Sequence, residues 1–226
     1  MTEGAILGID TSGAAGSVAV LLGETQREIV FSEGLIHGVA LAPNVARILA
    51  EAGVAPDGLR GIGVGLGPGS YTGVRVGVAF AKTLAFATGV PVAGVSSLRA
   101  MAGGAPDDRT IVCVRDARRG TLYLEIYGPG RRPERPLSLV TLDEVTALLP
   151  PGALVIGDAT ERFADLLSGD GRDLGGAELG RSSATVVARL ARDEWERGVT
   201  VDVHDLSPIY LRPSEAEERA ATRGDA

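Results

Sequence analysis

The sequence holds 226 residues, enough for one large domain or two small ones with a substantial hydrophobic core. Hydrophobic residues make up 45% and charged residues 23%, which is an ordinary globular composition. The net charge of −7 argues against a protein that binds nucleic acid unaided, because such binding depends on Lys and Arg to neutralise phosphates.

The first half of the chain predicts an antiparallel start followed by strand–helix units. Three short apolar runs joined by tight turns are typical of an antiparallel sheet rather than of a strand–helix–strand unit. Apolar residues at helical spacing, ended by Gly53, then indicate a helix. In chain order we expect strands at 5–10, 17–22 and 27–33, a helix over 39–52, a strand at 61–66, a helix over 71–88, a strand at 91–95 and a short helix capped by Ser97.

A break in composition at residues 103–109 precedes a second set of elements. This set again opens with two strands joined by a turn, so each half begins with an antiparallel hairpin. We expect strands at 110–114 and 121–127, a Gly/Pro/Arg-rich stretch at 128–136, a helix over 141–149, a strand at 153–158 and a long helix over 182–197. The chain is therefore divided into a first half at 1–105, a second half at 106–206 and a charged C-terminal tail at 207–226.

Cysteine usage and the terminal segment indicate the cellular compartment. Cys113 is the only cysteine and lies in an apolar run, so we expect a buried core thiol. The N-terminus lacks a basic segment with a cleavage site, which predicts no secretory signal. The longest apolar stretch, residues 74–95, is interrupted by Arg75, Lys82 and Pro91 and is not expected to span a bilayer. These features predict a cytoplasmic protein.

Residues 63–77 form a glycine-rich loop between a predicted strand and a predicted helix. A Walker A loop needs a lysine within it, and Lys82 lies ten residues past Thr72. The dinucleotide fingerprint also fails, because Thr72 stands where the third glycine is required and the loop follows the fourth strand. Two interpretations remain: unpaired N–H groups at the helix start that attract an anion or carbonyl, or a tight connection whose glycines supply positive φ.

The predicted helix over 71–88 carries a ridge of small residues spaced four apart, Gly73, Gly77, Ala81 and Ala85. Glycine inside a helix costs about 1 kcal/mol relative to alanine, so its repeated use indicates a close approach to another element. Either the ridge packs on the protein's own sheet, or the ridge or the apolar side chains beside it meet a helix of a partner.

Four segments in order resemble the TsaB family, also called YeaZ, of the bacterial tRNA threonylcarbamoyladenosine system. They are ILGIDTS from residue 6, GLGPGSYTGVRVGVAFAKTLAFATGVPVAGVSSL from residue 65, DARRGTLY from residue 116 and SPIYLRPSEAE from residue 207. The resemblance covers nearly the whole chain, and four motifs in order are far more specific than one glycine pattern.

The resemblance implies an α/β fold of the actin-like, Hsp70 and sugar-kinase (ASKHA) class, with two related RNase H-like halves and a cleft between them. It implies a non-catalytic subunit, without cofactor or metal, that pairs with TsaD. With the ATPase TsaE, this pair supports transfer of a threonylcarbamoyl group from threonylcarbamoyl-AMP to the adenosine just 3′ of the tRNA anticodon. Contact with tRNA is then expected only through the complex, and no membrane partner is expected.

The resemblance also implies where a nucleotide cleft once lay. In active members of the superfamily, an acid at the end of each half's first strand positions phosphates and metal, and Asp10 and Asp116 occupy those places. TsaD binds metal through two histidines four apart, but here Leu41 stands four residues after His37, so we expect no metal site and a surface or capping role for His37. An Asx-turn or cap at Asp10 is the alternative. The predicted vestigial cleft consists of Asp10, Thr11, Ser12, Gly69, Ser70 and Asp116.

The predicted partner interface lies on the two helices of the first half. A helical surface meant for a related partner can also meet its own copy, so we expect a homodimer when the protein is alone. The interface residues are Gly73, Val74, Gly77, Val78 and Ala81 on the helix over 71–88, with Leu41 and Val45 on the helix over 39–52.

Alternative functions remain open. A small ATPase or kinase would use Asp10 and Asp116. A metallopeptidase-like hydrolase would need a second metal ligand beside His37. The second half also carries a group of arginines, which form either a solvated rim or a small contribution to tRNA contact within the complex. They are Arg115, Arg118, Arg119, Arg131, Arg132 and Arg135.

Overall fold

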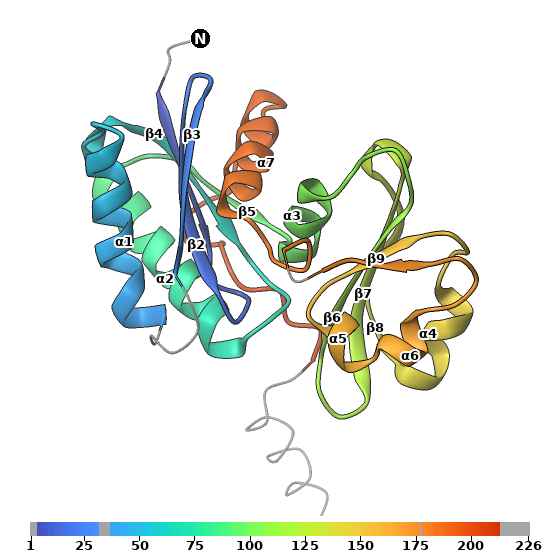
Figure 1. Cartoon of the computed structure of the whole chain (residues 1–226). Helices are drawn as coiled ribbons and strands as arrows, with labels where there is room; N and C mark the ends of the chain where they lie inside the picture. The colour runs from blue at the N-terminus through green and yellow to red at the C-terminus, as the bar shows by residue number, and fades with distance from the viewer. Residues whose placement is uncertain (1–3, 32–36, 177, 213–226) are drawn as a thin grey trace, which may run out of the picture.

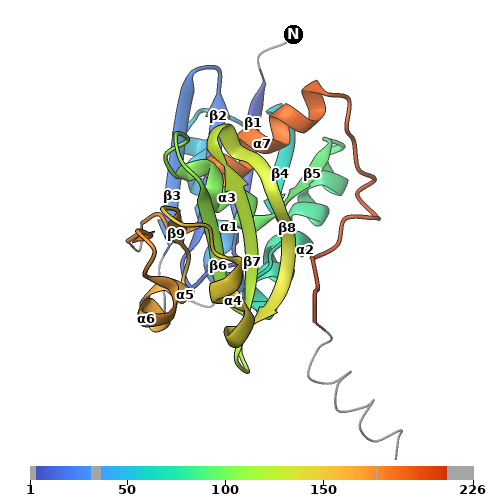
Figure 2. The ribbon, with the colours of Figure 1, turned by 90° about the vertical axis from the view of Figure 1, so that its right-hand side faces the viewer.

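The computed structural model describes residues 4–31, 37–176 and 178–212, except for the side chain of His37. The described chain forms two five-stranded sheets, one in each half, that stand side by side (Figure 1). The view in Figure 2 looks from the side of the second half, so its strands β7 and β8 lie in front of the first sheet. The two sheets form the framework that positions the candidate site.

The first half follows the predicted order of strands and helices. The buried strands and the helix caps at Ser70 and Ser96 define the elements. The cap of α3 is Ser96 and not Ser97 as predicted, because the hydroxyl of Ser96 accepts from the amide of Arg99 and Ser97 is the first residue of the helix. They are β1 (Ala5–Asp10), β2 (Gly16–Leu22), β3 (Thr25–Phe31), α1 (His37–Glu51), η1 (Pro56–Gly58), β4 (Leu59–Gly65), α2 (Tyr71–Thr88), β5 (Val92–Val95) and α3 (Ser97–Gly104).

The second half repeats this plan with shorter helices. Its elements are β6 (Ile111–Asp116), β7 (Thr121–Gly128), η2 (Pro129–Arg131), β8 (Arg132–Thr141), α4 (Leu142–Leu148), β9 (Leu154–Ile156), α5 (Ala159–Arg162), α6 (Ala164–Leu167), β10 (Asp173–Leu174) and α7 (Ala184–Glu196).

The two sheets share one topology. The first has the order β3-β2-β1-β4-β5, and the second has the order β8-β7-β6-β9-β10. In each half the second strand of the chain is antiparallel to its neighbours, while the first, fourth and fifth run parallel. This duplicated arrangement is the ASKHA fold of two RNase H-like halves that the sequence predicts.

The first sheet is covered on both faces, because its central strand alternates its side chains with a period of two. Leu7 and Ile9 join the core formed with α1 and α2, whereas Ile6 packs with Ala188 of α7. Between them Gly8 leaves room for α7, since a Cβ there would overlap the carbonyl of Ala184. Figure 1 shows α1 and α2 on one side of this sheet and α7 on the other.

The helix that follows the last strand of each half packs on the sheet of the other half. Helix α3 follows β5 but packs on β6 and β7, and α7 follows β10 but packs on the first sheet. Glu28 of β3 fixes the start of α7, because its carboxylate accepts hydrogen bonds from the amide of Ala184 and the hydroxyls of Ser183 and Thr185. The divisions expected at residues 105 and 206 thus separate the sheets but not the helices that cover them.

The segment after α7 runs along α2, as Figure 2 shows. We call residues 199–212 the strap. The ammonium of Lys82 donates to the carbonyls of His204 and Leu206 at 3.0 and 2.9 Å, and Leu206 is buried in the core of the first half. Residues 213–226, the rest of the predicted tail, lie outside the described residues.

Several elements differ from the sequence-based expectation. The stretch at 128–136 contains the first half of β8, an edge strand that carries Pro133 and Pro136. Proline is tolerated in an edge strand because such a strand has a neighbour on one side only and needs fewer ladder hydrogen bonds. The two prolines led the sequence analysis to expect a loop where the structure has a strand. The short elements α5, α6 and β10 were also not predicted.

The expectation for Cys113 is confirmed, since its side chain is completely buried and burial raises the pKa of the thiol. None of the helices within the described ranges has the length and apolar character needed to cross a bilayer.

Candidate functional site

The carboxylate of Asp10 lies at the end of β1 and is only 2% exposed. One oxygen accepts hydrogen bonds from the amide and hydroxyl of Ser12 at 2.8 and 2.6 Å. The other accepts from the hydroxyls of Ser97 and Ser182, both at 2.8 Å. Four donors from three segments therefore satisfy this buried carboxylate, as a buried charge requires. A metal or water could bind here only by displacing them.

The glycine loop is folded onto the turn after β1. The amide of Ser70 donates to the carbonyl of Ser12 at 2.8 Å, and a Cβ at Gly69 would overlap that same carbonyl. The hydroxyl of Ser70 caps α2 by accepting from the amide of Gly73, and Thr11 donates its hydroxyl to the carbonyl of Gly73 at 2.7 Å. The amide at the helix start thus pairs with a carbonyl of the protein itself, as the first interpretation allows, and Gly67 with a φ of 86° supplies the positive φ of the second.

Arg115 of β6 connects the second half to this loop pair. The residue is 2% exposed, and one terminal nitrogen donates to the hydroxyl of Ser12 and the carbonyl of Pro68, both at 2.8 Å. Its Nε lies 3.4 Å from a carboxylate oxygen of Asp158. The guanidinium therefore lies between the two halves, in the region where the sequence predicts a nucleotide cleft.

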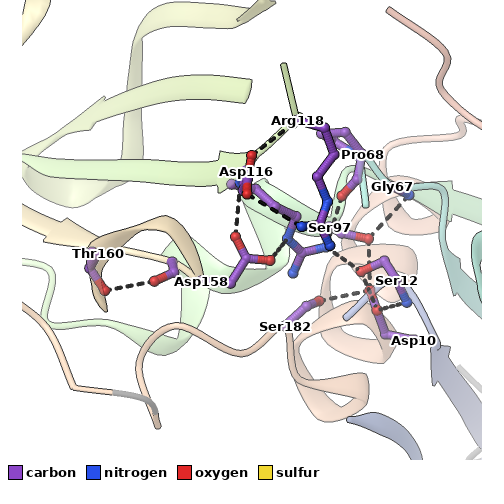
Figure 3. A network of polar contacts seen from close by, with 12 residues as sticks. Asp10, Ser12, Gly67, Pro68, Ser97, Asp116, Arg118, Asp158, Thr160 and Ser182 are labelled. Carbon is purple, nitrogen blue, oxygen red and sulfur yellow. Dashed lines mark hydrogen bonds and ion pairs between the residues drawn. The ribbon is translucent and has the colours of Figure 1, made fainter. Parts of the chain in front are cut away.

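Asp116 is also held by protein donors. One oxygen accepts from the amide of Arg118 and the other from the guanidinium of Arg162, each at 2.7 Å. The amide of Asp116 donates to Asp158. In Figure 3, Asp10 and Ser12 lie on one side of the network and Asp116 and Asp158 on the other. The six predicted cleft residues thus belong to one connected set of contacts that bridges the halves.

A cavity of about 800 Å³ lies beside this network, with Gly13, Asp158 and Glu161 among its lining residues. Arg115 and Arg181 also line it, and the Nε atom of each is buried without a hydrogen-bond partner. Within the described ranges, no three His, Cys, Asp or Glu side chains come together in a way that could hold a metal ion. The side chain of His37, on which part of the metal argument rests, lies outside the described residues.

The structure buries every residue predicted for the partner interface. Val74, Val78 and Ala81 are at most 4% exposed and belong to the core of the first half. A Cβ at Gly77 would overlap the hydroxyl of Thr11. Of the two interpretations of the ridge, packing on the protein's own sheet is therefore the one observed. The same correction applies to Gly73 on α2 and to Leu41 and Val45 on α1, which are also buried.

The outward faces of α1 and α2 carry other exposed residues. Val39 is 64% exposed, Tyr71 is 44% exposed and Phe86 is 74% exposed. Small exposed residues lie on the same two helices, at Ala42, Ala46 and Ala79 among others. A solvent-exposed surface with several large apolar side chains beside small ones is typical of a site of protein–protein contact.

Arg115 is the functional residue that the sequence analysis placed wrongly. It was grouped with exposed arginines, but it is buried and makes the contact between the halves. The signal was present in the strand: Ile111, Cys113 and Arg115 alternate on one face of β6, and the first two pack in the core beneath α3. Ser97, Ser182 and Asp158 were also missed as members of this network.

Known proteins resemble this chain in sequence and in fold. The family model described as "TsaD: tRNA N6-adenosine threonylcarbamoyltransferase" matches residues 35–160. The TsaB protein of Bacillus subtilis is 34% identical over 95% of this chain and 96% of its own length. The TsaB protein of Escherichia coli is 30% identical over 93% of this chain and 96% of its own length. The structure of YeaZ from Pseudomonas aeruginosa covers 92% of this chain and 100% of its own, with 27% identity and a TM-score of 0.83.

The duplicated sheet order and the acids at the ends of β1 and β6 define a protein of the ASKHA class. Within that class, the TsaB proteins of Bacillus subtilis and Escherichia coli are 34% and 30% identical to this chain over more than nine-tenths of its length. The chain belongs to the TsaB family.

Proposed function

We propose that this chain fills the TsaB role in tRNA threonylcarbamoyladenosine biosynthesis, as a non-catalytic subunit that holds TsaD in an active arrangement. The observation that carries the proposal is the saturation of Asp10 by four protein donors. An enzyme of this fold needs that carboxylate to act on metal or water, whereas a scaffold needs it only to fix the loops. The relatives from Bacillus subtilis and Escherichia coli are named as tRNA threonylcarbamoyladenosine biosynthesis proteins, which supports the same role.

TsaD is proposed to bind the outward faces of α1 and α2. The exposed apolar side chains Val39 and Phe86 support this placement, because large apolar groups at a surface gain most from burial in an interface. The buried ridge contributes indirectly: it brings α2 close to β1 through the contact of Gly77 with Thr11 and so fixes the angle of the helix.

Further partners follow from the same role. We propose that TsaE joins the larger complex, that tRNA reaches this chain through the complex, and that the isolated chain forms a homodimer through the face that otherwise meets TsaD. We propose that the reaction takes place in the cytoplasm, as the sequence analysis expects.

The rival ATPase or kinase would need Asp10 and Asp116 to be available to nucleotide and metal. The carboxylate of Asp10 already accepts hydrogen bonds from Ser97 and three other donors. The carboxylate of Asp116 already accepts from the amide of Arg118 and the guanidinium of Arg162. The hydrolase alternative depends on His37, whose side chain lies outside the described residues, and on further metal ligands that the sequence does not place beside it.

Size-exclusion chromatography of the full chain mixed with TsaD from the same organism tests the proposal. We expect a stable heterodimer, and Phe86→Glu should abolish it while leaving the melting temperature unchanged, because Phe86 is 74% exposed. Leu22→Glu is the matched control, an exposed apolar residue at the end of β2 that should leave the complex intact. Absence of a complex with the unmodified chain would overturn the proposal.

A further inference from the structure

Three segments that carry the family resemblance, far apart in the sequence, meet on one surface. The guanidinium of Arg212, at the end of the strap, donates to the carbonyl of Ala117 in the β6–β7 turn at 3.0 Å. Two residues earlier, the hydroxyl of Tyr210 accepts from Nε of Arg75 in the first turns of α2 at 2.7 Å. We call this the arginine–tyrosine surface, and it consists of Tyr71, Arg75, Arg118, Arg119, Tyr210 and Arg212.

The aromatic part of this surface is open to solvent. Tyr71 is 44% exposed and Tyr210 is 47% exposed, and their ring centroids lie 5.6 Å apart at a tilt of 42°. The guanidinium of Arg75 lies 3.8 Å from the centre of the Tyr71 ring. Two exposed rings beside a stacked cation provide the kind of platform on which an unpaired base stacks.

The charged part of the surface carries exposed arginine side chains beside a largely buried carboxylate. Arg118 is 79% exposed along its side chain, and Arg162, which lies outside the surface but shares Asp116 with Arg118, is 62% exposed. Both pair with Asp116, whose side chain is only 14% exposed, so one carboxylate serves two arginines. In a chain with a net charge of −7, this local excess of arginine departs from the average surface.

The turn itself uses arginine against backbone preference. Arg118 and Arg119 have φ values of 66° and 52°, and Gly120 follows with 73°. Left-handed backbone at two successive positions favours glycine or asparagine, because their side chains meet the least steric conflict there. Arginine at both positions therefore indicates a use for the side chains, which project from the tip of the turn and are exposed.

We infer that the arginine–tyrosine surface is an RNA-binding surface, on which the arginines contact phosphates and Tyr71 and Tyr210 stack an unpaired base. The inference rests on the proposed function, because it names tRNA as a direct contact of this chain within the complex with TsaD. It also resolves the two alternatives left for the arginines: Arg118 and Arg119 contact RNA, while Arg115 is buried and does not.

Fluorescence anisotropy with a labelled RNA anticodon stem–loop, added to the complex of the full chain with TsaD, tests the inference. Arg118→Ala combined with Arg119→Ala should weaken binding about tenfold and reduce the slope of log affinity against log salt by about 2, measured between about 50 and 200 mM salt. Tyr210→Ala should weaken binding roughly fivefold or more, and Tyr210→Phe should restore it, because the ring rather than the hydroxyl stacks. Arg132→Ala is the control, an exposed arginine beyond the opposite end of β7.

The outcomes are separable. RNA binding that is lost while the variants still bind TsaD supports the inference. Equal RNA binding and equal salt slope in all variants would overturn it. Weakened TsaD binding with normal RNA binding would also overturn it and assign the surface to a protein contact. If the unmodified chain fails to bind TsaD at all, the proposed function fails, and the inference that rests on it fails with it.

Discussion

The guanidinium of Arg115 in the second half donates to the hydroxyl of Ser12 in the first half across 2.8 Å. The same nitrogen reaches the carbonyl of Pro68, so one buried side chain joins β6 to both loops of the predicted cleft. A cation of the protein thus occupies the place between the two halves.

Arg115→Ala should lower the free energy of unfolding by about 3 kcal/mol, because it leaves the buried partners of the guanidinium unsatisfied. Arg115→Lys should recover only part of the loss, since a single ammonium cannot reproduce the planar guanidinium that also reaches Asp158. Urea denaturation followed by circular dichroism measures both. Arg132→Ala, an exposed control, should stay within about 0.5 kcal/mol of the unmodified chain. Equal stability of Arg115→Ala and this control would contradict the account.

Gly77→Leu should destabilise the isolated protein rather than act on the partner contact. The new side chain would be forced against Thr11 and the core of the first half, where overpacking typically costs about 1–3 kcal/mol. Ala79→Leu is the matched substitution on the same helix, at an exposed position, and should leave the melting temperature unchanged. Differential scanning calorimetry of the two variants checks this. A melting temperature of Gly77→Leu equal to that of the unmodified chain would show that Gly77 is not packed as described.

ATP with Mg²⁺ should bind the isolated chain with a dissociation constant weaker than about 1 mM, without measurable phosphate release. The reason is that the oxygens of Asp10 already accept four hydrogen bonds. Isothermal titration calorimetry and a phosphate-release assay measure these quantities. Asp10→Asn should reduce stability instead of an activity, because the amide cannot accept from all four donors. Robust hydrolysis that Asp10→Asn abolishes would refute the scaffold role.

Glu125 should make the stability depend on pH. This residue of β7 accepts from the hydroxyl of Ser96 at 3.1 Å, and its burial raises the pKa of the carboxyl above its usual value of 4.5. A carboxyl whose pKa is higher in the folded than in the unfolded protein favours folding fully below pH 4.5, and this contribution is lost as the pH rises through the folded value. Glu125→Gln should therefore gain stability relative to the unmodified chain as the pH increases from 4.5. Urea titrations at several pH values measure the free energy of unfolding of both proteins. If the difference between them does not change with pH, the pKa of Glu125 is not raised in the folded protein.

The order of strands and helices was predictable, since each buried strand of the first half is a continuous apolar run and α1 and α2 show helical spacing. The edge strand β8 was not, because Pro133 and Pro136 are typical of loops and only the paired neighbour β7 makes the segment a strand. The exchange of α3 and α7 between the sheets also could not be inferred from chain order, because amphipathic spacing shows that a helix packs but not on which sheet.

The two acids of the candidate site were predictable from their positions after apolar strands. Their saturation was not, because Ser97 and Ser182 lie 87 and 172 residues from Asp10 in the chain. The sequence also could not show which way the ridge on α2 faces. The valines beside Gly73 and Gly77 could pack on the protein's own sheet or on a partner, and only the folded structure shows that they pack on the sheet. Arg115 was the exception, because the alternation of β6 already indicates a buried face.

Reconstituted threonylcarbamoyl transfer tests the scaffold role most directly. Purified TsaD and TsaE, supplied with tRNA, ATP and threonylcarbamoyl-AMP, are assayed for threonylcarbamoyladenosine by mass spectrometry of the digested tRNA, with and without this chain. We expect modification only when the chain is present with TsaD, no modification by the chain alone, and full activity from Asp116→Asn, since Asp116 has no catalytic part in this account. Modification by the chain without TsaD, or equal modification by TsaD and TsaE in its absence, would contradict the role proposed for it.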